Sequence, residues 1–94
     1  MIKIVYVYEV SEEKRDEYLK ITAEVIKPFW ESHGCEAYTL WVPTEGSTTF
    51  MKEMDFKDEG TMQSTLKLAA AEPIKKLFSE LASNVARTTY RQVV

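Results

Sequence analysis

The sequence of 94 residues is poor in the residue types that most often hold metals, form disulfides or cradle nucleotides, with one cysteine, one histidine and three glycines. A single cysteine cannot form an intrachain disulfide, and His33 with Cys35 supplies only two of the four ligands that a structural zinc ion takes. No glycine-rich loop follows an expected strand, which excludes a phosphate cradle of that type. We therefore expect a protein that works without a metal ion or a cofactor.

A surplus of basic residues and a long apolar run are missing as well. The 12 basic residues are outnumbered by 15 acidic ones, so the formal net charge is -3 and there is no electrostatic footprint for nucleic acid or an anionic membrane surface. No apolar stretch approaches the roughly 20 residues that a membrane-spanning helix needs. The chain starts in an expected strand rather than in a secretory signal, so we expect a cytoplasmic location and neither nucleic-acid nor membrane partners.

What the sequence has is a clear order of hydrophobic periods. Segments rich in β-branched and aromatic residues alternate with segments whose apolar residues recur every three or four positions. They predict strands over 2–9, 35–42, 48–56 and 85–94, a helix over 12–33, and helical segments over 59–84. This β-α-β-β-α-β order predicts a ferredoxin-like α+β fold, with one four-stranded antiparallel sheet covered by helices on one face. The length fits a single domain, residues 1–94.

Three residues predict where the helices begin, bend and end. Asp58 is a good N-cap for the second helical region. Pro28 lies inside the first helical pattern, where it removes a backbone hydrogen bond and predicts a kink or a short break before the last turn. Asn84 is expected to end the last helix.

Both faces of the expected sheet carry apolar residues. On the third strand Phe50, Met54 and Phe56 share one face around Lys52, and this set suits the helix side. The first strand is apolar on both faces, so the face without helices also needs cover, and a second copy of the chain is the expected cover. Which face lines an enclosed space stays open, because a one-residue bulge would exchange the two faces.

Two segments carry a resemblance to a known superfamily. Residues 6–10, YVYEV, lead into SEEKRDEYL at 11–19, and residues 28–35, PFWESHGC, interrupt and close the first helix. They resemble the opening strand and helix, and the proline-interrupted helix end, of dimeric α/β-barrel proteins of the antibiotic-biosynthesis-monooxygenase and NIPSNAP type. The resemblance implies a barrel made by two facing ferredoxin-like sheets, with ligands inside it or between each sheet and its own helices.

The same resemblance implies a range of activities. Members of the superfamily include cofactor-free monooxygenases of phenolic or quinol substrates, haem-degrading enzymes and isomerases. The oxygenases and haem degraders tend to carry an asparagine on the first strand and a tryptophan near the third, where this chain has Tyr6 and Phe56. No histidine follows His33, which counts against haem degradation and against a histidine base.

The candidate site residues are polar and aromatic side chains that strands could present to an enclosed space. The catalytic candidates, which would handle protons in place of a histidine, are Glu53, Tyr6 and Tyr8. The candidates for ligand binding are Trp41, Arg87 and Tyr90. In the alternative interpretation Glu53 pairs with an arginine such as Arg87 or Arg91, across the sheet or across the dimer seam, and the tyrosines supply buried area and one hydrogen bond each.

Three functions stay open at this point. The first is a cytoplasmic homodimer that encloses an apolar or aromatic small molecule and acts on it as a cofactor-free monooxygenase-like enzyme or isomerase. The second is a ligand-binding dimer without chemistry, and the third is a structural or regulatory dimer. The large side chains separate them: aromatic residues that line a cavity favour the first two, and aromatic residues that fill it favour the third.

Overall fold

One antiparallel sheet organises the protein, and its strands follow the order β2-β3-β1-β4. The computed structural model describes all 94 residues. The strands are β1 (Ile2–Glu9), β2 (Cys35–Trp41), β3 (Thr49–Phe56) and β4 (Ser83–Arg91). β1 and β3 occupy the centre and β2 and β4 the edges, which is the strand order of the ferredoxin-like fold. The predicted fold class is confirmed.

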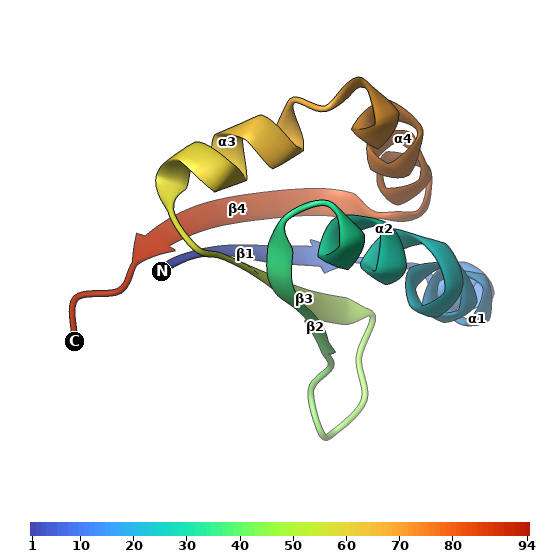
Figure 1. The fold of residues 1–94 in the computed structure, drawn as a ribbon. Helices are drawn as coiled ribbons and strands as arrows, with labels where there is room; N and C mark the ends of the chain where they lie inside the picture. Colours follow the sequence, from blue (N-terminus) through green and yellow to red (C-terminus); the bar gives the residue numbers. More distant parts are fainter.

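The helices form a second layer on one face of this sheet (Figure 1). The first helical region consists of α1 (Glu12–Ile21), a π-helical turn η1 (Thr22–Ile26) and α2 (Lys27–Ser32). The second consists of α3 (Glu59–Leu66), a short 3-10 turn η2 (Ala69–Ala71) and α4 (Glu72–Leu81). The main core cluster joins Ile4 and Met54 of the sheet with Ile26, Trp30 and Ile74 of the helices. These contacts fix which sheet face the helices cover.

The π-helical turn η1 explains how the long helix keeps one face on the sheet. The buried residues of the whole first helical region follow one another at a spacing of four; they are Tyr18, Thr22, Ile26 and Trp30. In a regular α-helix each such step turns the side chain by about 40° away from the previous one. The wider turn of η1 underwinds the helix and corrects this drift. The break expected at Pro28 is therefore present as a π turn directly before α2, in whose first turn Pro28 lies.

The second helical region starts as predicted and ends earlier than predicted. The Asp58 carboxylate accepts a hydrogen bond from the backbone N–H of Thr61 at 2.7 Å, which caps α3. The expectation that Asn84 ends the last helix is wrong, because α4 ends at Leu81 and Asn84 lies in β4 with a φ of 52°. The Asn84 side chain donates to the Glu9 carboxylate at 2.7 Å, at the point where the pairing of β1 with β4 shifts register. This residue therefore makes a strand irregularity rather than a helix end.

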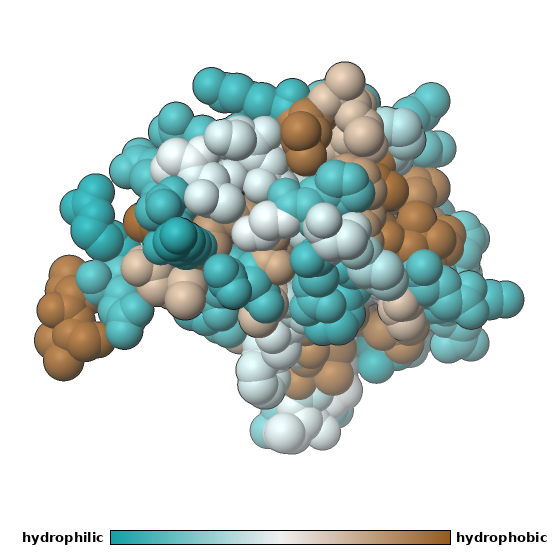
Figure 2. Space-filling view, in the orientation of Figure 1, coloured by the Kyte–Doolittle hydropathy of each residue, from teal (hydrophilic) through white to brown (hydrophobic).

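The face opposite the helices is open in the single chain. Val7, Trp41 and Tyr90 on this face are 42%, 50% and 52% exposed. β4 is exposed along its whole length, on both faces. Beyond it the apolar residues Val93 and Val94 are exposed, and Figure 2 shows this tail standing apart from the body of the molecule. The protein thus leaves one edge strand and one sheet face uncovered.

Candidate functional site

A cavity of about 260 Å³ lies between the sheet and the helices. Its size is near the lower end of small-molecule sites, and its wall is mostly apolar. Strands β1, β3 and β4 and helix α4 contribute side chains to the wall, and α2 and α3 add one side chain each. The lining residues are Tyr6, Trp30, Lys52, Met54, Leu66, Ile74, Lys75, Phe78 and Arg87. Aromatic residues therefore line an open space rather than fill it.

Strand pairing places two cations on either side of one tyrosine at the floor of this cavity. Tyr6 of β1 pairs with Lys52 of β3 on one side and with Arg87 of β4 on the other. Directly paired residues of neighbouring strands point to the same face of a sheet, so all three face the helix layer. The Lys52 Nζ lies 4.4 Å and the Arg87 Cζ 5.8 Å from the centroid of the Tyr6 ring. We call Lys52, Tyr6 and Arg87 the cross-strand row.

Lys52 is the most unusual member of this row, because its ammonium is buried among aromatic rings without an anion. The residue is only 4% exposed, and its Nζ lies 3.4 Å from the centroid of Phe78 and 5.6 Å from that of Tyr38. No ion pair and no hydrogen bond is made by this Nζ. Burial lowers the pKa of Lys52 from 10.5 to about 7. Near neutral pH the group is therefore partly a free amine, which can accept a proton.

The charge of the cavity wall is entirely positive. Lys52, Lys75 and Arg87 line it, and no acidic residue does. Lys75 is 3.4 Å from the Glu72 carboxylate, whereas Arg87 makes no ion pair. Burial raises the pKa of Tyr6, and the Arg87 charge opposes that rise. Tyr6 consequently stays a neutral phenol between two basic groups.

Of the six side chains expected to form a site, Tyr6 and Arg87 line the cavity and Tyr8 lies behind its wall. Tyr8 belongs to a second buried cluster, where its hydroxyl contacts the Tyr18 hydroxyl and its ring stacks on Phe50. Burial is the main cause that raises the pKa of Tyr8 well above that of a free phenol. Its hydroxyl is thus held away from the cavity as a neutral group.

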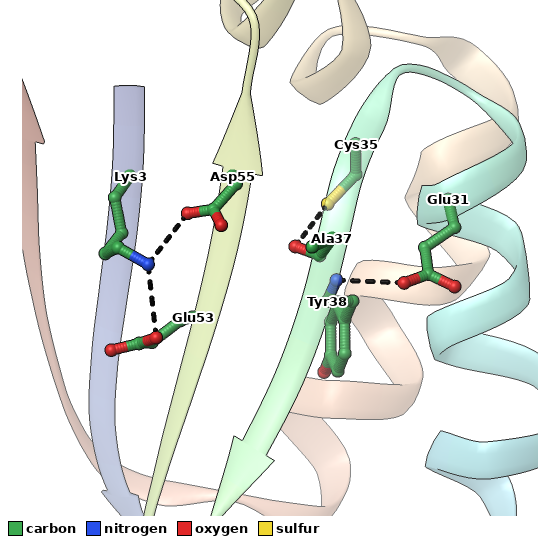
Figure 3. Close-up of polar contacts among 7 residues, drawn as sticks. All are labelled: Lys3, Glu31, Cys35, Ala37, Tyr38, Glu53 and Asp55. Carbon is green, nitrogen blue, oxygen red and sulfur yellow. Dashed lines mark hydrogen bonds and ion pairs between the residues drawn. The ribbon is translucent and has the colours of Figure 1, made fainter. Parts of the chain in front are cut away.

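The other three side chains, Glu53, Trp41 and Tyr90, lie on the opposite face of the sheet. Glu53 forms an ion pair with Lys3 at 3.1 Å, and Lys3 also contacts Asp55 at 2.9 Å (Figure 3). Within one chain Glu53 therefore pairs with a lysine and not with an arginine, because β1 rather than β4 lies next to its strand. Pairing with an arginine across a dimer seam stays a prediction. Trp41 lines a shallow apolar hollow, and Tyr90 pairs with Lys3 at the other end of the sheet. The six candidates cannot line one site within a single chain.

The residues that sequence reasoning missed are Lys52, Trp30 and Phe78. Each was assigned to the core pattern or to a helix stripe, where a lysine is usually accommodated with its charge in water. The available signal was the position of Lys52, since it interrupts three large apolar residues on a strand face expected to pack under helices. A lysine in that position is either paired or tuned, and here it has no pair.

Two other sequence features contribute no site. Burial raises the pKa of the Cys35 thiol to about 11, which keeps it from acting as a thiolate near neutral pH. The His33 Nδ1 lies 2.7 Å from the Phe29 carbonyl oxygen, at the end of α2. No group of three or more histidine, cysteine, aspartate and glutamate side chains is arranged for a metal ion. No helix is both long enough and apolar enough to cross a membrane.

Comparisons with known proteins identify the fold. No protein-family model and no curated protein sequence matches this chain. Among solved structures, SnoaB, a cofactor-independent oxygenase from Streptomyces nogalater, superposes with a TM-score of 0.85 at 14% identity, over 99% of this chain and 95% of that chain. A Deinococcus radiodurans protein grouped with the antibiotic biosynthesis monooxygenases gives a TM-score of 0.82 at 15% identity, over 100% of this chain and 94% of that chain.

A third similar structure is a conserved protein from Methanosarcina mazei Go1, with a TM-score of 0.81 and 22% identity over 98% of this chain and 92% of that chain. Likenesses at these identities establish the fold. The chain therefore has the ferredoxin-like fold of the antibiotic biosynthesis monooxygenases, and this part of the expected resemblance is confirmed. The likeness to NIPSNAP proteins stays a prediction.

Proposed function

We propose that this protein encloses an ionisable aromatic small molecule in the Lys52 cavity and oxidises it as a cofactor-independent monooxygenase. The observation that carries the proposal is the buried, unpaired Lys52 amine on the wall of an aromatic cavity. The fold shared with a cofactor-independent oxygenase supports it. The proton-handling role that the sequence suggested for Glu53 and the tyrosines passes to Lys52 in this proposal.

The first step is a proton transfer. A phenol that stacks over Tyr6 presents its hydroxyl to the neutral Lys52 amine, which takes the proton and becomes an ammonium ion. Aromatic faces then stabilise this cation, since Phe78 and Tyr6 both lie within 4.5 Å of the Nζ. The substrate is left as a phenolate, paired with the new ammonium in an environment of low dielectric constant.

The second step uses dioxygen as the oxidant. The phenolate transfers one electron to dioxygen, and the superoxide so formed bonds to the ring carbon para to the phenolic oxygen. Lys52 returns its proton to the peroxide, then removes the hydrogen of that carbon as a proton while the O–O bond breaks and hydroxide is released. The hydroxide takes this proton from Lys52 and leaves as water, which restores the neutral amine. The sum is one phenol and one dioxygen giving one quinone and one water, so atoms and electrons balance without a cofactor.

We also propose that the protein acts as a homodimer through the open sheet face. The support is that apolar Val7, Trp41 and Met51 surround a shallow hollow on that face and that β4 is uncovered. The same patch on two copies would meet about a two-fold axis. A cytoplasmic location is part of the same proposal.

Oxygen consumption with 1-naphthol as substrate tests the proposed activity. We expect conversion to 1,4-naphthoquinone with one oxygen atom from ¹⁸O₂, and a kcat/KM that rises with pH through about 7 as Lys52 loses its proton. The Lys52→Met variant should lose at least about a hundredfold in kcat/KM. Lys76→Met, which changes an exposed lysine of α4, is the matched control and should keep the wild-type rate.

Other outcomes discriminate the alternatives. Wild-type turnover by Lys52→Met would show that the amine is not the base. Isomerisation of the ligand under nitrogen would favour an isomerase. Tight binding of naphthol with no oxygen consumption would favour a ligand-binding dimer without chemistry.

A further inference from the structure

The cavity holds more positive charge than a neutral phenol can use. The chain as a whole is acidic, with a net charge of -3, yet three cations and no carboxylate line this one cavity. Lys75 pairs with Glu72, whereas Lys52 and Arg87 have no carboxylate partner. The free guanidinium of Arg87 on the cavity wall is the feature that the proposed oxygenase function does not explain.

Arg87 is the cation whose lack of a partner is most telling. Arg91, four residues further along the same face of β4, reaches Glu59 of α3 at 3.9 Å. Lys75, the third cation of the wall, reaches Glu72 at 3.4 Å. Arg87 has no such partner, and its guanidinium lies 5.8 Å from the centroid of the Tyr6 ring. Its charge therefore points at the cavity without an intramolecular counter-ion.

The two unpaired cations differ in depth and in chemistry. Lys52 is buried under Phe78, where it is suited to exchange a proton. Arg87 is exposed on β4 at the rim, and an arginine side chain stays charged at every physiological pH. A planar guanidinium matches a carboxylate through two parallel hydrogen bonds. Because Tyr6 lies between them in the cross-strand row, one flat ligand over Tyr6 can reach both.

We propose that the substrate is a hydroxylated aromatic carboxylic acid, whose hydroxyl lies at Lys52 and whose carboxylate is bound by Arg87 at the rim. Arg87 is then the residue that selects acidic substrates, and Lys52 the residue that reacts. This inference rests on the proposed function, since it names the substrate class for the same cavity. It adds the carboxylate as a second functional group of the substrate, and Arg87 as the residue that recognises this group.

The test compares three ligands of the same bicyclic shape. They are 5-hydroxy-1-naphthoate, its neutral amide, and 1-naphthol, which lacks the group altogether. Binding is followed by the fluorescence of the naphthol ring at low ionic strength. We expect the acid to bind the wild-type protein about tenfold more tightly than the amide. A charge-assisted hydrogen bond to an exposed arginine contributes a binding free energy at the low end of the range for such bonds. The preference should weaken as salt is added.

Two variants assign that preference to one residue. Arg87→Gln should bind the acid and the amide equally, with the affinity for the amide unchanged. Arg91→Gln, which removes an arginine from the same strand face, is the matched control and should keep the preference. Equal affinity for acid and amide in the wild-type protein would overturn the inference. An equal loss in Arg91→Gln would overturn it too, since the effect would then come from the general charge of β4.

The outcome also separates this inference from the proposed function. If 1-naphthol is bound and oxidised to 1,4-naphthoquinone in a Lys52-dependent way while the carboxylate adds no affinity, the substrate class is wrong and the oxygenase proposal stands. If the acid binds through Arg87 but Lys52→Met leaves its oxidation unchanged, the carboxylate site stands and the proposed chemistry is wrong. If none of the three ligands binds, both are wrong.

Discussion

Replacing Lys52 with methionine should make the protein more stable near neutral pH, although it removes the group that we propose to be reactive. Methionine is unbranched and of similar length, so it can fill the same space between Phe78 and Tyr6 without a charge. In the wild-type protein the folded-state pKa of Lys52 is about 7, against 10.5 for an ordinary lysine. That difference corresponds to about 5 kcal/mol of stability lost when the buried amine is protonated.

The sign of the pH dependence follows from proton binding. Between about pH 7 and 10.5 the unfolded chain holds a proton on Lys52 that the folded chain lacks, so the contribution of this group to stability rises with pH. Below about pH 7 both states are protonated, and the full cost of burying the ammonium is present. Local relaxation and the aromatic faces reduce that cost, so we expect Lys52→Met to be more stable than wild type by about 2 to 5 kcal/mol at pH 6.

Urea unfolding at equal protein concentration measures this difference. The two proteins should differ most at pH 6, and the gap should narrow by about 2 kcal/mol by pH 8.5. Taking the difference between them cancels other titrations, such as that of Cys35. The control Lys76→Met should follow the wild-type curve. A stability gap that is the same at pH 6 and pH 8.5, or a destabilised Lys52→Met at both, would refute the assignment of Lys52 as a desolvated amine.

Two further predictions concern assembly and the helix end. Trp41→Glu places a charge in the apolar hollow of the open sheet face, at the end of edge strand β2, so light scattering should find a monomer of 10.9 kDa in place of the proposed dimer. Thr44→Glu in the adjoining loop should behave as wild type does, and a dimeric Trp41→Glu would contradict the proposed interface. Gly34→Ala should cost at least about 2 kcal/mol in urea unfolding, because Gly34 has a φ of 119° and a Cβ there would overlap the Thr65 hydroxyl. Gly46→Ala, at a φ of 77° with open space around it, should lose only about 1 kcal/mol, and equal losses at both positions would show that the overlap is unimportant.

The fold could be predicted from the sequence because each change between the apolar periodicity of a strand and that of a helix occurs within a short stretch of residues. Phe50, Met54 and Phe56 alternate along one strand, and all three are buried under the helices as expected. The exact geometry of the first helical region was harder to predict from the sequence. Leu19 and Val25 fit the apolar stripe of a regular α-helix, yet they are 36% and 41% exposed. Val25 lies inside the π turn, which changes which residues share a face. A local pattern with fixed periodicity does not contain that change.

The site was only half predictable, because it depends on strand pairing. Tyr6 and Arg87 are 81 positions apart in the sequence, and only the pairing of β1 with β4 brings them together. The pairing of β1 with β3 puts Glu53 on the far face, and its pairing with β4 puts Tyr90 there, whereas sequence reasoning had combined both with Tyr6. A shift of one residue in register would have reversed this arrangement, and no local signal in the sequence fixes that register.

The presence of a basic group at a position where burial is costly is itself an argument for function at Lys52. An apolar residue of similar length would fit between the same rings and would remove the cost of burying an ammonium ion. A structural role would require a partner for the charge, as Glu53 provides for Lys3 on the open face, and Lys52 has none. What the position does supply is an amine that titrates near neutral pH, on the wall of a cavity and next to a second unpaired cation. Groups that lower stability cluster at functional sites, and Lys52, which is buried without a carboxylate partner, meets that description within this chain.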